Sequence, residues 1–186
     1  MNFLLFFGTM AAVLLSVVFL HNRLVRSRNL ADEGWSGIDV QLRRRADLIP
    51  NLVATVQAYA THERSVFEQV TRARSATLDA SDIDAHTAAA NCMQIALPRL
   101  LAVAEAYPAL NADRNFRQLA DELASVEDEL QLARRYYNGT TRNFNILIES
   151  FPSNLIARFF GFRKYAYFNI GDEAARNVPE VSPGSF

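Results

Sequence analysis

The helical character of this chain is clearest in residues 116–151, which read FRQLADELASVEDELQLARRYYNGTTRNFNILIESF. Apolar residues recur there in alternating steps of three and four, and only Thr140 in the series is polar without an aromatic ring. Such a seam predicts a helix over about residues 111–151 that packs lengthwise on other helices. Gly139 lies inside this helix, and its missing side chain would permit a close approach or a local bend. The series comprises Phe116, Leu119, Leu123, Val126, Leu130, Ala133, Tyr137, Thr140, Phe144, Leu147 and Phe151.

Two further helices are predicted upstream. Residues 31–75 carry an apolar stripe at helical spacing, in which Arg45 and Glu63 occupy the two interrupting positions, and we expect one helix kinked at Pro50. Asp82 predicts the start of a second helix, which Pro98 would kink and Pro108 would end. We expect Cys92 to be a buried thiol on its apolar side.

The end of the chain is less regular. Pro152 follows the long helix, Ser153 is predicted to cap a short helix to Phe160, and Gly161 would stop it. The next residues alternate loosely, which indicates an extended segment. The fold class is therefore all-α: an N-terminal transmembrane helix, a bundle of long antiparallel helices and one short helix.

The transmembrane helix is predicted from residues 3–20, FLLFFGTMAAVLLSVVFL, which contain no charged side chain. A helix of this length rises about 27 Å, close to the ~30 Å hydrocarbon core of a bilayer. A cleaved signal peptide would need a basic residue before the apolar run, whereas Arg23, Arg26 and Arg28 follow it. The flanks therefore favour an uncleaved anchor in a bacterial inner membrane, with the N-terminus outside and the remainder cytoplasmic.

We therefore predict three parts: an anchor (residues 1–22), a cytoplasmic helical-bundle domain (23–170) and a mobile acidic tail (171–186). Within the anchor, Gly8, Ala12 and Ser16 recur every four residues and form one stripe of small side chains. Such a stripe lets two membrane helices approach closely, although small residues are common in membrane helices in any case.

Composition excludes several classes of function. Lys and Arg number 19 against 20 acidic residues, so the whole chain is not an electrostatic nucleic-acid binder. One cysteine excludes an internal disulfide and a cysteine-built zinc site. His62-Glu63 fails the zinc-protease pattern because Val66 stands where the second histidine is needed. We therefore expect that the protein is not an enzyme and that it has no catalytic residue, metal ion or cofactor.

Two groups of polar residues remain as candidates. The first comprises polar side chains on or beside the apolar seams, which form either an interhelical network that fixes the register or a groove for a partner. The second is the basic and aromatic segment 156–168, which fits a membrane surface or single-stranded nucleic acid, or simply caps the bundle core; the core cap is preferred. The first group is Arg44, Arg45, Asp47, Asn51, Glu63, Arg135, Tyr137, Asn138 and Asn145, and the second is represented by Arg158, Arg163 and Lys164.

Several segments of the sequence resemble the LemA family. They are WSGIDVQLRRRADLIPNLVATVQAYATHE (35–63), AEAYPAL (104–110), FRQLADELASVEDELQLARRYYNGTTRNFN (116–145), ESFP (149–152) and ARNVPEV (175–181). The resemblance covers nearly the whole chain, and the run around Pro50 is its most specific part. Carried over position by position, it marks Arg44, Asp47, Leu48, Ile49, Pro50, Asn51, Tyr59, Glu63, Glu127, Arg135, Tyr137, Asn138, Asn145, Phe151 and Pro152.

The resemblance implies a single-pass bacterial membrane protein with a helical bundle and no established enzymatic activity. Some members of that family take part in building magnetosome membranes, and their genes often lie near those of membrane proteases and TPM-domain proteins. We therefore expect a self-assembling scaffold whose partners are the lipid bilayer, further copies of the chain and other membrane proteins, but no nucleic acid. The alternative is an adaptor that presents partners to a membrane-bound protease or chaperone.

Overall fold

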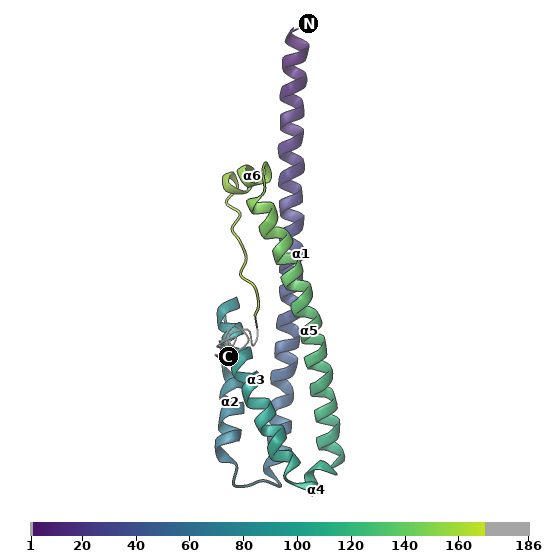
Figure 1. Cartoon of the computed structure of the whole chain (residues 1–186), viewed down its shortest axis with the longest axis vertical. Helices are drawn as coiled ribbons and strands as arrows, with labels where there is room; N and C mark the ends of the chain where they lie inside the picture. Colours follow the sequence, from purple (N-terminus) through teal and green to yellow (C-terminus); the bar gives the residue numbers. More distant parts are fainter. Residues whose placement is uncertain (1, 170–186) are drawn as a thin grey trace, which may run out of the picture. The chain divides into compact units, whose positions relative to one another are not determined.

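A computed structural model describes residues 2–169, apart from the side chain of Leu4 (Figure 1). Within that range every regular element is a helix, so the all-α prediction is confirmed. The predicted acidic tail lies outside the described residues. The helices are α1 (Asn2–Gln57), α2 (Arg64–Asp79), α3 (Ile83–Glu105), α4 (Pro108–Asn111), α5 (Arg114–Glu149) and α6 (Ser153–Phe159).

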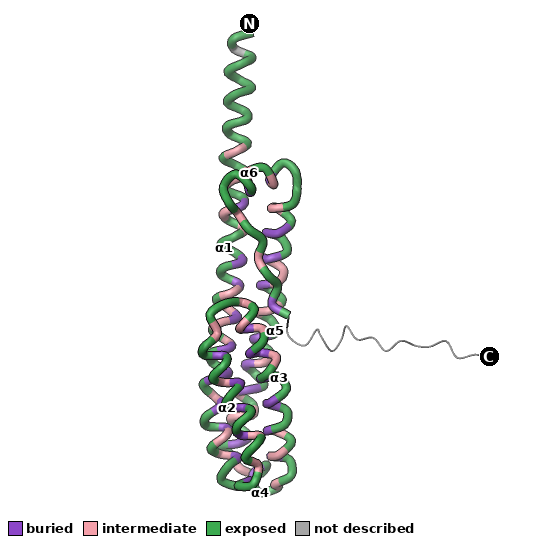
Figure 2. The backbone as a smooth tube through the Cα atoms, turned by 90° about the vertical axis from the view of Figure 1, so that its left-hand side faces the viewer, coloured by how far each residue is buried: buried purple, intermediate pink, exposed green. Residues whose placement is uncertain are grey.

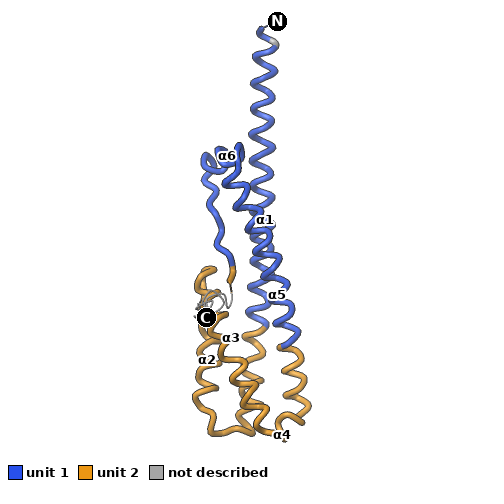
Figure 3. Tube along the Cα trace, in the orientation of Figure 1, with its two compact units in different colours: residues 1–44, 124–167 blue, residues 45–123, 168–186 orange. Residues whose placement is uncertain are grey.

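The chain divides into two compact units (Figure 3). Unit 1 comprises residues up to 44 together with 124–167, and unit 2 comprises residues 45–123 together with those from 168 onward. Helices α1 and α5 each contribute to both units.

The core of unit 1 is built by α1, α5, α6 and the segment after α6. Leu24, Phe144 and Ala157 are buried together, and Phe162 and Tyr165 pack against them. Helices α1 and α5 approach closely at Gly34, where an added Cβ would lie 3.0 Å from the Cα of Tyr137. An added Cβ at Gly139 would meet nothing within 4 Å, so of the two roles predicted for Gly139, a close approach or a local bend, the close approach is wrong, and it occurs at Gly34 instead.

The core of unit 2 is larger and continuous. The end of α1 packs there with α2, α3, α4 and the start of α5, and α2 and α3 lie against each other. The buried positions of α1, α3 and α5 follow the predicted stripes, whereas on α2 the predicted Val66 is only half-buried and Phe67 beside it is buried. They include Ile49, Leu52 and Val56 from α1, Phe67, Val70 and Ala73 from α2, Met93, Leu97 and Leu100 from α3, and Phe116 and Leu123 from α5.

The predicted single helix over residues 31–75 is wrong, because the chain leaves the helix between Gln57 and Arg64. Tyr59, which the helical spacing places on the apolar stripe of residues 31–75, is 40% exposed, and its hydroxyl donates to the Asp113 carboxylate at 3.3 Å. Glu63 lies in the connection as the residue preceding α2, half-buried, and its side chain caps nothing. The apolar spacing continues across this connection, which is why periodicity alone indicated one helix.

Proline does not interrupt either helix that contains it internally. Pro50 deprives the Ala46 carbonyl of its helical donor, and Arg74 Nε of α2 donates to that oxygen at 2.9 Å instead. Helix α3 likewise continues through Pro98, whereas Pro108 follows its end and begins α4, as predicted.

The predicted caps are confirmed at two of three positions. The Asp82 side chain accepts from Ala85 N at 2.8 Å and begins α3. Gly161 follows α6 with a φ of 74°, a left-handed conformation that favours glycine. Ser153 is not the cap of α6: Pro152 precedes that helix, and the Ser153 hydroxyl donates to the carbonyls of Leu147 and Ser150.

Candidate functional site

The first part of α1 is apolar and exposed (Figure 2). By length and composition, α1 could cross a membrane, and none of its most apolar window is buried. Gly8, Ala12 and Ser16 are all exposed there, and an added Cβ at Gly8 would meet nothing within 4 Å. The Ser16 hydroxyl donates to the Ala12 carbonyl at 2.8 Å, so the one hydroxyl of the stripe has its hydrogen-bond acceptor within the same helix.

Two residues of the predicted polar cluster come together on one backbone segment in unit 1. The Tyr137 hydroxyl donates to the Ala166 carbonyl at 2.7 Å. Asn145 Nδ2 donates to the Tyr165 carbonyl at 2.9 Å, and Tyr165 N donates to Asn145 Oδ1 at 3.0 Å. Both side chains are buried, so α5 fixes the strand-like segment after α6 through its backbone.

The same segment is tied to α1 by a pair of residues that sequence reasoning missed. The Tyr165 hydroxyl donates to Asp32 Oδ1 at 2.7 Å. Burial, followed by this hydrogen bond and the charge of Asp32, raises the pKa of Tyr165 to about 12. Burial also raises the pKa of Tyr137, so both hydroxyls remain neutral donors. Asp32 and Tyr165 are 133 residues apart, and no local pattern links them.

The other members of the polar cluster are spread over both units. In unit 1, Arg44 and Arg135 are exposed and Asn138 is half-buried; in unit 2, Asp47 and Asn51 are exposed. Arg45 of unit 2 is 2% exposed, as a seam position requires, and takes part in further interactions, as does Asn138. A partner-binding role for this set stays a prediction.

The basic and aromatic segment divides into two classes of side chain. Phe162 and Tyr165 are half-buried and Phe168 is buried, which agrees with aromatic residues that complete a core. Phe159 is 80% exposed, and Phe160 and Tyr167 are exposed as well, so core completion does not account for them. The charged members Arg158, Arg163 and Lys164 are all exposed, and Lys164 pairs with the Glu149 carboxylate.

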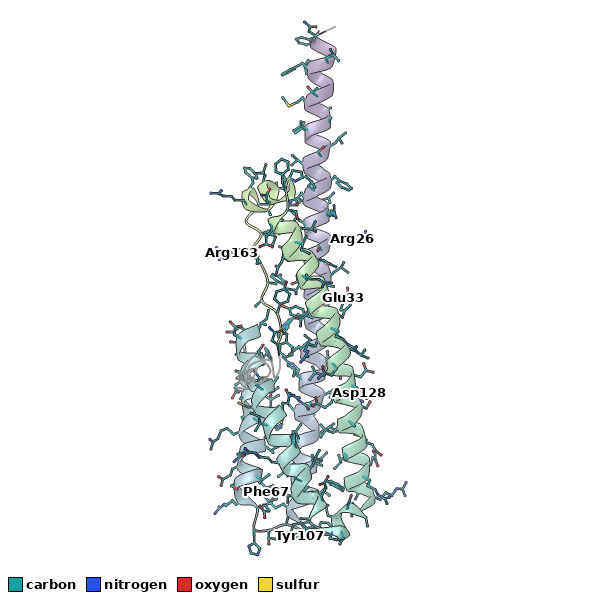
Figure 4. All side chains as sticks on the ribbon, viewed as in Figure 1. Arg26, Glu33, Phe67, Tyr107, Asp128 and Arg163 are labelled. Carbon is teal, nitrogen blue, oxygen red and sulfur yellow. The ribbon has the colours of Figure 1, made fainter. Side chains whose placement is uncertain are left out.

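A hollow of about 420 Å³ opens beside this segment, within unit 1. The Arg28 guanidinium lies 5.7 Å from the centre of the Phe162 ring, and the His21 ring lies 4.4 Å from that of Phe160. The side chains of this region are drawn in Figure 4, where Arg26 and Arg163 are labelled. Its lining offers aromatic surface, two arginines and a histidine, a combination that suits an anionic group: His21, Val25, Arg28, Phe144, Phe160, Gly161, Phe162, Arg163 and Tyr165.

Across the part of the chain that the structure describes, no three His, Cys, Asp or Glu side chains are grouped to hold a metal ion. Cys92 is exposed, so the expectation of a buried thiol is wrong. The next residue, Met93, occupies the buried position of α3, which turns Cys92 away from the core.

Comparison with known proteins gives a consistent result. A family model described as the LemA family matches residues 34–182. The magnetosome protein MamQ of Magnetospirillum gryphiswaldense is 23% identical over 204 residues, covering 96% of this chain and 74% of the relative. The magnetosome protein MamQ 2 of Paramagnetospirillum magneticum is 24% identical with the same coverage. Protein LemA of Metamycoplasma hominis is 27% identical over 153 residues, covering 81% of this chain and 69% of the relative.

Proposed function

The chain belongs to the LemA family, and from that premise we propose that it is a single-pass membrane protein that assembles with copies of itself and organises the membrane around it. It is a structural protein and carries out no reaction. The family resemblance stated from the sequence is confirmed by the match over residues 34–182.

The observation that carries the proposal is the continuity of α1. Its exposed apolar part and the buried Leu24 of unit 1 belong to one 56-residue helix. An anchor formed by the apolar part would therefore be joined to unit 1 without an intervening loop. Arg23, Arg26 and Arg28 lie just after the apolar run, which supports a cytoplasmic location for the domain in a bacterial inner membrane.

Self-assembly is supported by the open stripe of Gly8, Ala12 and Ser16. Helices in lipid associate through close packing of small residues, and no atom of the described residues lies within 4 Å of an added Cβ at Gly8. Two of the relatives are named magnetosome proteins. The family resemblance links such members to the building of magnetosome membranes, and we propose that copies of this chain likewise act on a membrane.

A structural role also agrees with how the buried polar side chains are used. Tyr137 and Asn145 bind the chain's own backbone at Tyr165 and Ala166. Their hydrogen-bonding groups are therefore engaged in holding the fold and are not presented to a substrate.

The test is the mass of the full-length protein in native nanodiscs. We expect more than one copy per particle, and a shift toward one copy in the Gly8→Leu/Ala12→Leu variant. The matched control, Met10→Leu/Leu14→Met, changes the opposite face of the same helix and should leave the assembly unchanged. A wild-type protein that is monomeric at every concentration would refute the scaffold, and a monomer recovered with a membrane protease or chaperone would establish the adaptor instead.

A further inference from the structure

Helix α6 presents its apolar side chains outward. Leu155 and Phe159 lie four residues apart on α6 and are 59% and 80% exposed, and Phe151, which precedes Pro152 and the helix, is 79% exposed. Ser153 and Ala157, which also lie four residues apart, are the buried ones. A helix at an aqueous surface normally shows the opposite pattern. A row of large apolar side chains left in contact with solvent indicates a surface that another phase or partner covers.

The position of α6 in unit 1 identifies what covers it. The apolar run of α1 ends at Leu20, and the ring of the next residue, His21, lies 4.4 Å from that of Phe160. One turn further along α1, Leu24 shares a buried cluster with Ala157 of α6. Helix α6 therefore lies beside the first turn of α1 after the apolar run (Figure 1). If residues 3–20 cross the bilayer, this turn is at the level of the lipid headgroups.

The charges near α6 match a leaflet of anionic lipid. Residues 21–28 and 149–164 contain one acidic side chain, Glu149, and it pairs with Lys164. The remaining charged side chains in these two ranges are exposed arginines, a composition typical of segments that contact anionic headgroups. They are Arg23, Arg26, Arg28, Arg158 and Arg163.

The hollow between α1 and the segment after α6 offers a place for one headgroup. Arg28 and Arg163 line it together with His21, whose Nδ1 is buried and has no hydrogen-bond partner among the described residues. Guanidinium groups bind phosphate through paired hydrogen bonds. The hollow, at about 420 Å³, has room for a phosphate and the glycerol attached to it.

We propose that α6 is a second membrane contact of this chain: Phe151, Leu155 and Phe159 insert into the interface of the leaflet that α1 enters, and Arg28 and Arg163 bind the phosphate of an anionic phospholipid. The inference rests on the proposed membrane anchoring and adds to it the partner, a phosphatidylglycerol-type lipid. It also gives the anchored domain a fixed orientation, because two points of contact restrain the rotation that a single helix permits.

The depth of α6 can be measured with one tryptophan. Trp35 is the only native tryptophan, so Trp35→Phe provides a silent background for Phe159→Trp. The matched control is Leu132→Trp on α5, where the native side chain is 53% exposed in the same unit. In vesicles of phosphatidylcholine and phosphatidylglycerol at 7:3, we expect lipids brominated near the headgroup to quench the residue-159 probe at least threefold more than the control. Equal quenching of the two probes would overturn the insertion of α6.

The headgroup site has its own measurement. The double variant Arg28→Gln/Arg163→Gln is compared with Arg43→Gln/Arg142→Gln, which removes two exposed arginines in the same unit, one on α1 and one on α5. Native mass spectra of protein from mixed-lipid nanodiscs should show retained phosphatidylglycerol over phosphatidylcholine for the wild type and the control variant. We expect that preference to fall at least fivefold in the first variant, and an unchanged preference would overturn the assignment of these two arginines.

Failure of this inference can be told apart from failure of the proposed function. Extraction of the membranes with alkali shows whether α1 is inserted. If the protein resists extraction while the residue-159 probe stays in water, the inference is wrong and the anchor stands. If alkali releases the protein, both the anchoring and the contact of α6 fail.

Discussion

The hydrogen bond from Arg74 to the Ala46 carbonyl makes a strong prediction about Pro50. Proline removes one donor from α1, and Arg74 Nε supplies a replacement from α2 at 2.9 Å. Replacing Arg74 with alanine should therefore strand a carbonyl on a residue with no exposed surface. Replacing Pro50 with alanine should restore the donor from within α1 and make the arginine dispensable.

The magnitudes follow from the groups involved. Stranding a buried acceptor costs about 1–3 kcal/mol, so Arg74→Ala should lower the free energy of unfolding by that amount. Pro50→Ala should raise it, by at most the ~3 kcal/mol that separates the two residues in a helix interior. In the Pro50→Ala background, Arg74→Ala should cost only the packing of its stem, ~0.5 kcal/mol. The coupling energy between the two positions is then the difference between these costs, about 0.5–2.5 kcal/mol.

The assay is urea denaturation of the full-length protein in detergent, followed by far-ultraviolet circular dichroism, for the wild type, both single variants and the double variant. Arg72→Ala serves as the control, because Arg72 is an exposed arginine on the same helix. It should change the unfolding free energy by less than ~0.5 kcal/mol. Additive effects of the two substitutions, with Arg74→Ala equally costly beside proline and beside alanine, would refute the reasoning.

Three further predictions concern unit 1. The added Cβ of Gly34→Ala would lie 3.0 Å from the Tyr137 Cα on α5, whereas that of Gly37→Ala would lie 3.9 Å from the Ala133 Cβ, an ordinary contact. Urea titrations should therefore find Gly34→Ala less stable than Gly37→Ala by about 1–3 kcal/mol. Equal stability of the two variants would show that the helices can separate freely. Asn145→Ala removes both hydrogen bonds to Tyr165 and should accelerate amide exchange at residues 162–169; unchanged protection there would mean that other contacts hold the segment. Because the folded-state pKa of Tyr165 is about 12 against an ordinary value of 10.0, its contribution to stability is complete below pH 10 and is lost as pH rises from 10 to 12. Fluorescence-monitored stability should show this loss, and a Tyr165→Phe protein with the same pH dependence would contradict it.

Periodicity predicted the helices because each buries one face along much of its length. The seam of residues 116–151 contains no slip, and α5 extends over Arg114–Glu149. The same rule failed at residues 58–63, where Tyr59 and Glu63 hold the expected spacing although the backbone has left the helix. Neither glycine nor proline marks that connection. Hydrophobic spacing reports which side chains are apolar, and it does not report whether the backbone between two apolar stretches remains hydrogen-bonded.

The sequence also predicted that buried polar residues need partners without indicating which partners. Tyr137 was placed on the seam of the helix and Asn145 beside it, as parts of either an interhelical network or a groove for a partner. They bind the backbone of residues 165–166 instead. A backbone carbonyl is present at every position, so no side-chain pattern singles out Tyr165 or Ala166 as the acceptor.

Only the burial of the aromatic residues near α6 distinguishes those that complete a core from those that remain exposed. Six of them lie within residues 156–168, and the sequence alone favours one explanation for all six. The structure separates Phe162 and Phe168, which contribute to cores, from Phe159, which is 80% exposed. The free-energy cost of exposing a phenylalanine side chain to water grows with its exposed apolar area. The exposed side chain of Phe159 is therefore more stable where water is excluded. The membrane contact proposed for α6 would provide such a place, because His21 follows the apolar run and its ring lies 4.4 Å from that of Phe160.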